Sequence, residues 1–254
     1  MLKKLFITLL IALNFYTQFC FPKIIANQNI RLSNLKNHQQ VVDFTVEAVY
    51  EVDNQNPLGA RFRHNQSGFV LDLLRIQSVP QAFMWVNSHP VSDRGEPHTL
   101  EHLLLGKGTK GRYVASLEEM SLGNSSAFTA QLRTCYHFHT PAGGSVFFNL
   151  FQIKLDAMLH PNFSDEEIRR EVRNMGITND PVDGSLSLEE KGTVYNEMIS
   201  SFERPWGNLY FELGKMIYDH DHPSAYSAGG YPTAIREMKP VHIRNFHNST
   251  HHLN

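Results

Sequence analysis

The chain has 254 residues, of which 41% are hydrophobic and 19% are charged. This is the composition of a globular protein, with enough residues for one large domain or two small ones. The formal net charge is −2, which argues against a nucleic-acid-binding protein, because such a protein would carry a basic surface.

The N-terminal residues 1–26 have the pattern of a signal peptide. Lys3 and Lys4 give a positive start, and the nearly apolar run 5–15 has the length of a signal-peptide core but is too short to span a bilayer. We therefore expect an exported protein, periplasmic or secreted, with no stable membrane span after the signal is removed. The alternative is an uncleaved signal anchor that keeps the protein on the membrane.

The rest of the chain alternates between strand and helix patterns. Residues 27–40 are polar and predict an irregular lead-in, and residues 41–254 predict one α+β domain. Strands are expected at 41–52, 68–77, 81–87 and 127–139. Helices are expected at 97–106, 114–122, 144–159, 164–174, 186–198, 206–218 and 241–247. This mixture favours a largely antiparallel sheet covered by helices.

The stretch His98-Thr99-Leu100-Glu101-His102 is the most informative motif in the chain. Residues i and i+4 on a helix share one face, so both imidazoles can reach one metal ion. Glu101 projects close to the same face without having to be a ligand, which suits a base beside a metal-bound water. The order H-x-x-E-H is that of the inverted zincins. The alternative is a surface helix with two unrelated histidines.

A further protein ligand is expected later in the chain, because catalytic zinc usually takes three protein ligands and keeps one position open. In the expected helix 186–198, Glu190 and Glu197 lie two turns apart on one face. The same helix carries the apolar residues Val194 and Met198, so one side is expected to be buried. A carboxylate beside a buried apolar stripe must be paired, protonated or metal-bound. A solvated helix face is the alternative.

Together these segments resemble peptidase family M16, the pitrilysin and insulinase group, and most of all its presequence protease branch. The stretch 98–102 matches the inverted zinc motif of that family, and 191–198 resembles its second metal segment, K-G-V-V-[FY]-N-E-M. The segments 127–136 and 227–232 resemble its N-A-[FWY]-T…T-C-Y and S-G-G-x-P segments. The resemblance covers residues 40 to 254 and implies the N-terminal unit of a longer enzyme.

The resemblance implies a role for each matching residue. His98, His102 and Glu197 would hold one Zn²⁺ ion, and Glu101 would act as the general base. Glu190 would orient a ligand histidine through a hydrogen bond. The edge strand to which a peptide substrate adds would include Ser126, Ala127, Phe128 and Thr129.

The chain also departs from the family pattern. Ser126 stands where the family usually has Asn, and residues 111–115 replace the P-V-x-D-P-F segment that usually follows the zinc helix. The chain stops at Asn254, inside what would be the first of several homologous units. The second half of an active chamber is therefore expected from another M16 half or subunit.

The sequence predicts a zinc-dependent metalloendopeptidase module that hydrolyses unstructured peptides with metal-activated water. The alternative is a metal-binding but catalytically incomplete half-unit, acting as a partner subunit or a truncated product. A structural protein without metal is the remaining interpretation. The expected partners are a peptide substrate and a second M16 half, with no nucleic acid.

Overall fold

The computed structural model describes residues 31–52 and 56–252. The predicted signal peptide, 1–26, lies outside the described residues, as does the beginning of the lead-in. The chain divides into two compact units, one ending at Val79 and one comprising Pro80–His252. The range 41–254, predicted from the sequence to be one domain, is thus shared between two units.

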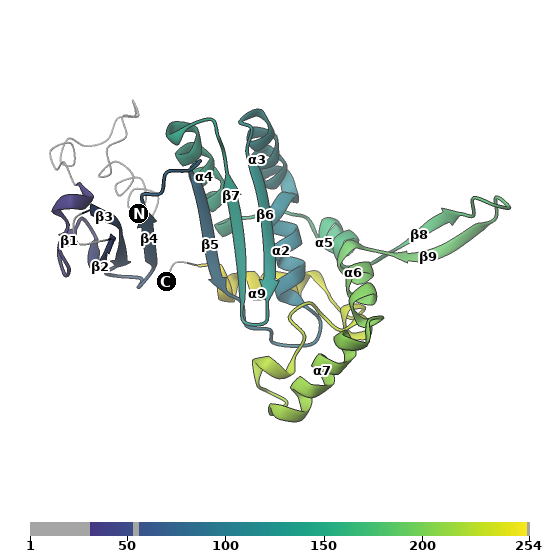
Figure 1. Cartoon of the computed structure of the whole chain (residues 1–254). Helices are drawn as coiled ribbons and strands as arrows, with labels where there is room; N and C mark the ends of the chain where they lie inside the picture. Colours follow the sequence, from purple (N-terminus) through teal and green to yellow (C-terminus); the bar gives the residue numbers. More distant parts are fainter. Residues whose placement is uncertain (1–30, 53–55, 253–254) are drawn as a thin grey trace. The chain divides into compact units, whose positions relative to one another are not determined.

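The first unit is a four-stranded antiparallel sheet in the order β1-β2-β3-β4 (Figure 1). Its elements are the 3₁₀ helix η1 (Leu32–Asn34) and the strands β1 (Gln40–Val41), β2 (Phe44–Val52), β3 (Asn56–His64) and β4 (Val70–Leu74). Strand β3 is not predicted from the sequence, because Pro57, Gly59 and two arginines interrupt its apolar pattern. Both arginines are paired across the sheet, Arg61 with Asp72 and Arg63 with Glu47, so the charges lie on the exposed face.

The second unit contains a three-stranded antiparallel sheet in the order β5-β7-β6. Its strands are β5 (Gln81–Asn87), β6 (Asn124–Ala130) and β7 (Arg133–His139). The long strand expected at 127–139 is a hairpin in the structure, because the chain turns at Gln131 and Leu132. Strand β6 is therefore an edge of this sheet, and β7 lies in the middle.

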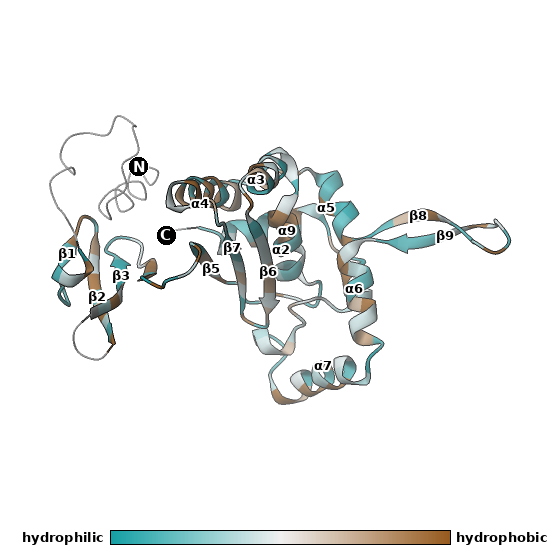
Figure 2. Cartoon of the chain, turned by 45° about the horizontal axis from the view of Figure 1, so that its top comes forward, coloured by the Kyte–Doolittle hydropathy of each residue, from teal (hydrophilic) through white to brown (hydrophobic). Residues whose placement is uncertain are grey.

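One face of this sheet is covered by helices α2 (Glu96–Gly106), α3 (Gly108–Met120) and α4 (Gly144–Leu159) (Figure 1). Phe138 of β7 packs with Phe147 and Leu150 of α4 in one buried cluster. The hydropathy colouring shows α4 as largely hydrophobic, as expected for a helix whose apolar face lies against a sheet (Figure 2).

A second buried cluster of this unit joins four further helices to α2. These are α5 (Asp165–Val172), α6 (Thr193–Phe202), α8 (Pro232–Ile235) and α9 (Pro240–Thr250). The cluster contains Leu100, Leu103, Phe163, Ile168, Val172, Val194, Tyr195, Ile235, Ile243 and Phe246. Leu100 and Leu103 of α2 are both 0% exposed, so α2 lies at the centre of the unit. Burial of the face with Leu100 and Leu103 fixes the rotation of α2 about its axis, and so the direction in which its other side chains point.

The single helix expected at 186–198 is wrong. Residues Leu186–Lys191 form β9, which pairs with β8 (Asn174–Asn179) in an antiparallel hairpin that extends away from the helices of its unit (Figure 1). Helix α6 begins only after Gly192, which has φ of +124°. A Cβ at Gly192 would lie 2.6 Å from the carbonyl oxygen of Val172, so glycine permits both the turn and the close approach to α5.

The predicted fold class, α+β with antiparallel sheets covered by helices, is confirmed. Helix α4 matches its predicted range, and α2, α5, α7 (Pro205–Ile217) and α9 fall close to theirs. Helix α3 begins at Gly108, six residues before the predicted start at 114, and the short helix α8 is not predicted from the sequence. A second 3₁₀ helix, η2, lies at Pro223–Ala225. Within the described ranges no helix combines the length and the apolar character needed to cross a membrane.

Candidate metal centre

Helix α2 presents both motif histidines on one face. Pro97 lies in its first turn, and Gly95 precedes it with φ of +76°. A Cβ at Gly95 would lie 2.5 Å from the carbonyl oxygen of Gly229, so only glycine lets the start of α2 approach the 227–230 loop this closely. The two rings are nearly perpendicular, at 85°, and their Nε2 atoms are 3.0 Å apart.

Glu197 of α6 completes a cluster of three possible ligands. Its Oε2 lies 3.3 Å from Nε2 of His98 and 3.4 Å from Nε2 of His102. One ligand atom from each residue falls within 4.8 Å of the others. Ligands bound tetrahedrally to zinc at about 2.0–2.1 Å stand about 3.3 Å from each other, so the three atoms already have the spacing of a zinc site. The residues present therefore fit the metal.

Both histidines are held by their other ring nitrogen. Nδ1 of His102 lies 2.9 Å from Oε1 of Glu171, and Nδ1 of His98 lies 3.3 Å from the carbonyl oxygen of Gly229. An acceptor at Nδ1 keeps the proton there and leaves the Nε2 lone pair for a metal. The geometry thus favours the same tautomer, with Nε2 unprotonated, for both rings.

The pKa values of the two histidines are shifted in opposite directions. Burial lowers the pKa of His98, and the neighbouring His102 lowers it further, against the nearby carboxylates. At His102 burial opposes the charged form, but the hydrogen bond to Glu171 and the charge of Glu197 outweigh it and raise the pKa. Burial also opposes the charged form of Glu171, yet its bonds to His102 and Lys107 lower its pKa to about 2. These interactions thus favour an ionised Glu171 beside His102.

Glu101 lies beside the cluster and is 5% exposed. Its Oε2 accepts a hydrogen bond from the Thr129 hydroxyl at 2.6 Å. Thr129 lies opposite Thr134 on β7, whose hydroxyl is 2.7 Å from that of Ser88. Strand β6 thus reaches the motif helix through Thr129, and one oxygen of Glu101 is fixed by this contact.

The predicted substrate segment, Ser126 to Thr129, lies on β6, the edge strand of the sheet. Ser126 and Phe128 are exposed, whereas Ala127 and Thr129 are partly buried on the side of the helices. An edge strand offers unpaired backbone groups to an added strand. Substrate binding by this segment stays a prediction.

The prediction that Glu190 orients a ligand histidine is wrong. Glu190 lies on β9, and the break at Gly192 removes it from the helix face that carries Glu197. Its carboxylate is 2.7 Å from Nε of Arg173 and 2.6 Å from Nη2 of Arg236. Glu171 of α5 holds the histidine instead. The sequence signal for Glu171 is weak: an acidic residue beside Val172 on a short amphipathic helix, with nothing local to connect it to His102.

No family model matches the chain. Similar proteins include the mitochondrial presequence proteases of Gibberella zeae, 27% identical over 85% of this chain and 22% of the relative, and of Danio rerio, 28% identical over 84% and 21%. The chain thus spans about a fifth of the length of these relatives.

Solved structures with the same fold include pitrilysin, with a TM-score of 0.60 and 19% identity over 86% of this chain and 22% of that chain. A second is an inactive M16 peptidase domain from Pseudomonas fluorescens, with a TM-score of 0.54 and 12% identity over 72% of this chain and 41% of that chain. At these identities the structural similarity establishes the fold alone.

Proposed function

We propose that this chain, which is related to the M16 peptidases by sequence and by fold, is a zinc-dependent endopeptidase module acting on unstructured peptides. The observation that carries the proposal is the convergence of His98, His102 and Glu197 from two helices, with Glu101 beside them. Two neutral nitrogens and one carboxylate are a common ligand set of catalytic zinc.

The residues of the chain divide the chemistry among them. A zinc ion held by His98, His102 and Glu197 would act as a Lewis acid and lower the pKa of a water molecule. Glu101 accepts the proton of the attacking water and passes it to the amine that leaves. Thr129 holds Oε2 of Glu101, which leaves Oε1 to exchange the proton. Glu197 has a half-exposed side chain, at 50%, so the site is open to solvent on that side.

The substrate would add to the free edge of β6. Exposed backbone groups at a sheet edge bind an extended peptide through main-chain hydrogen bonds, which requires an unstructured substrate rather than a particular sequence. Because Thr129 lies on β6 and contacts Glu101, a peptide on that edge would run past the general base.

A metal-binding but catalytically incomplete half-unit is the second candidate. It is supported by the structural similarity to an inactive M16 domain. In this case the chain would bind zinc and require a second M16 half or subunit for turnover. Both candidates place the zinc in the same three ligands.

The test is a quenched-peptide assay of the zinc-loaded protein and of its Glu101→Gln variant. The variant should lose hydrolysis and still bind zinc, because the amide cannot accept the proton and is not a ligand. Glu119→Gln, an isosteric change at an exposed position of α3, is the matched control. Hydrolysis by Glu101→Gln would refute the role of Glu101. Turnover seen only after a second M16 subunit is added would support the half-unit.

The place of action is a separate proposal. We infer export from the signal-like pattern of 1–26, with a membrane-anchored form if the signal is not cleaved. Fractionation of cells expressing the full chain tests it, because the protein should be recovered outside the cytoplasm, and a purely cytoplasmic protein would refute it.

A further inference from the structure

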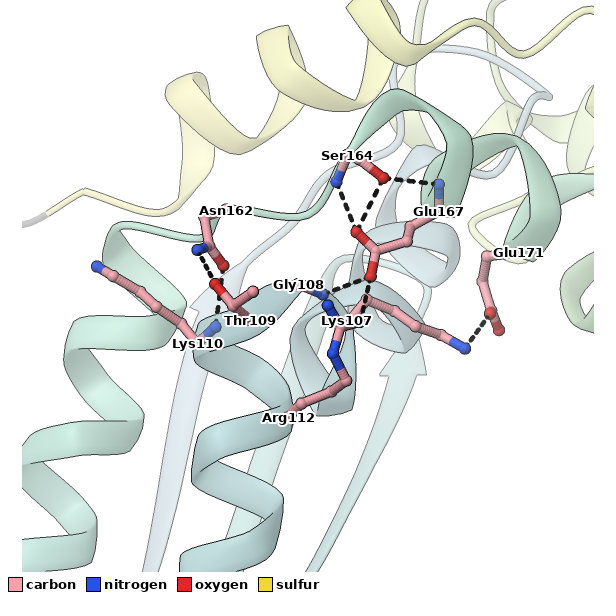
Figure 3. Close-up of polar contacts among 9 residues, drawn as sticks. All are labelled: Lys107, Gly108, Thr109, Lys110, Arg112, Asn162, Ser164, Glu167 and Glu171. Atoms are coloured by element: carbon pink, nitrogen blue, oxygen red, sulfur yellow. Dashed lines mark hydrogen bonds and ion pairs between the residues drawn. The ribbon is translucent and has the colours of Figure 1, made fainter.

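Lys107 directly follows the helix that carries both histidines. Its backbone N–H closes α2 by donating to the carbonyl of Leu103 at 3.0 Å, and its backbone is extended at the start of α3. Its side chain reaches towards α5, where Nζ lies 2.8 Å from Oε2 of Glu171 (Figure 3). Lys107, at the end of the motif helix, thus pairs with Glu171, the carboxylate that contacts His102 of the same helix.

The carboxylate of Glu171 is shared between two partners. Oε1 faces Nδ1 of His102 at 2.9 Å, and Oε2 faces Nζ of Lys107 at 2.8 Å. Glu171 is 5% exposed, so water does little to solvate its charge. The terminal torsion of a glutamate is broad, and a single hydrogen bond does not fix the carboxylate plane. A second partner, on the other carboxylate oxygen, fixes the plane.

The attachment of α5 to the α2–α3 junction does not depend on Lys107. Glu167, one turn before Glu171, accepts from the Gly108 N–H at 3.0 Å and from Arg112 at 2.5 Å (Figure 3). It also forms a capping box with Ser164 at the start of α5. Glu167 therefore connects α5 to the α2–α3 junction. Lys107 instead contacts Glu171, the carboxylate that faces His102.

The junction that carries Lys107 has little freedom to move. Gly108 has φ of +75°, and a Cβ there would lie 2.6 Å from Oδ1 of Asn162 and 2.7 Å from the backbone N of Phe163. The glycine lets the junction lie directly against the segment that leads into α5. The backbone position of Lys107 is therefore fixed relative to Glu171.

We propose that Lys107 is a positioning residue of the metal site, acting through Glu171 on His102. By holding Oε2, Lys107 keeps Oε1 directed at Nδ1 of His102, so that the ring keeps its proton on Nδ1 and presents Nε2 to the metal. The inference rests on the proposed function, because it needs the cluster of His98, His102 and Glu197 to bind zinc.

The experiment measures the affinity of the purified full chain for Zn²⁺ by competition with a chromogenic chelator. Loss of a direct orienting partner typically weakens metal binding 10–100-fold, so loss of Lys107, one step further out, should weaken it about threefold to tenfold. Lys107→Met should show this loss, and Lys107→Arg should restore most of the affinity.

Lys110→Met is the matched control. Lys110 lies three positions further on, has a similarly exposed side chain (39% against 41%) and forms an ion pair with Asp156 at 3.1 Å. Its removal costs the same charge and an ion pair away from Glu171, with a carboxylate whose side chain is 34% exposed against 6% for that of Glu171. Its zinc affinity should equal that of the wild type. An equal loss in both variants would mean that the effect is not specific to the position of Lys107, and would overturn the proposal, because removal of a positive charge by itself favours binding of a cation.

A double-mutant cycle separates a positioning role from a structural one. In a Glu171→Gln background, Lys107→Met should weaken zinc binding no further, because its route to His102 has been removed. The same loss in both backgrounds would overturn the proposal, as would an unchanged affinity of Lys107→Met in the wild type. If Lys107→Met folds poorly by near-UV circular dichroism, Lys107→Gln is put through the same cycle. A wild-type chain that does not bind zinc would instead refute the proposed function.

Discussion

At the scale of single residues, Thr129 connects the sheet edge to the proposed general base. Its hydroxyl donates to the carboxylate of Glu101, which is 5% exposed. A hydrogen bond to a charged group contributes more than a neutral one, and an unpaired buried charge is costly. Thr129 thus contributes both to stability and to the orientation of Glu101.

Replacing Thr129 with Val removes the hydroxyl and keeps the shape. We expect the free energy of unfolding to fall by about 1.5–3 kcal/mol, because Glu101 loses its charged hydrogen bond. Thr129→Ser retains the donor and should recover most of this loss. Urea unfolding followed by tryptophan fluorescence measures the effect, since Trp85 and Trp206 both lie in the second unit. Equal stability of Thr129→Val and wild type would show that the bond contributes nothing.

Much of the candidate site follows from local spacing, and the rest depends on contacts between distant segments. The i, i+4 spacing of His98 and His102 on a helix is a local property, so the sequence predicts it. The pairing of His102 with Glu171 joins segments that are distant in the chain, and no periodicity encodes it. The sequence does not show which acidic residue, Glu171 or Glu190, contacts a histidine. Glu190 instead pairs with Arg173 and Arg236, and neither contact follows from a local sequence pattern.

At the scale of elements, the predictions fail where the backbone changes direction. The stretch 186–198 has helical spacing of apolar and acidic residues, but Gly192 at φ of +124° ends one element and begins another. The turn between β6 and β7 contains Gln131 and Leu132, which lack the glycine or asparagine that usually indicates a hairpin. Helix α4, which has no such interruption, matches its predicted range at both ends.

The start of α5 gives a pH-dependent prediction at the element scale. Hydrogen bonds from the Ser164 backbone, from Arg112 and from Gly108 lower the pKa of Glu167 to about 2, from its usual 4.5. Because the folded-state pKa is the lower one, the stabilisation is present above about pH 4.5 and is lost as the pH falls towards 2. Glu167→Gln should therefore be less stable than wild type at pH 7, with a difference that shrinks below pH 4.5.

Urea unfolding at a series of pH values, followed by fluorescence of the two tryptophans, measures this difference. Glu166→Gln is the control, because Glu166 forms only an exposed pair with Arg170, with side chains 60% and 69% exposed. Such a pair contributes little and should give a small difference at every pH. A wild-type advantage over Glu167→Gln that stayed constant from pH 7 to pH 3 would contradict the assigned ionisation.

At the scale of the whole molecule, all the proposed site residues lie in the second unit, Pro80–His252. They come from α2, α5, α6 and β6, which are distant in sequence and meet only when this unit is folded. The buried cluster around Leu100 and Leu103 holds α2 against α5 and α6. Metal binding and folding of the second unit are therefore coupled, because the unfolded chain does not bring Glu197 to the two histidines.

This coupling predicts that zinc stabilises the second unit. A ligand that binds only the folded state, at a hundred times its dissociation constant, adds about 2.7 kcal/mol to the free energy of unfolding. Zinc should raise the urea midpoint of the tryptophan signal, and a chelator should return it to the value of the metal-free protein. Glu197→Gln should lose most of this gain, because it removes one of the three ligands, whereas Glu203→Gln, an exposed change at the end of α6, should keep it. A zinc-induced gain that is the same in Glu197→Gln and wild type would place the bound metal elsewhere on the chain.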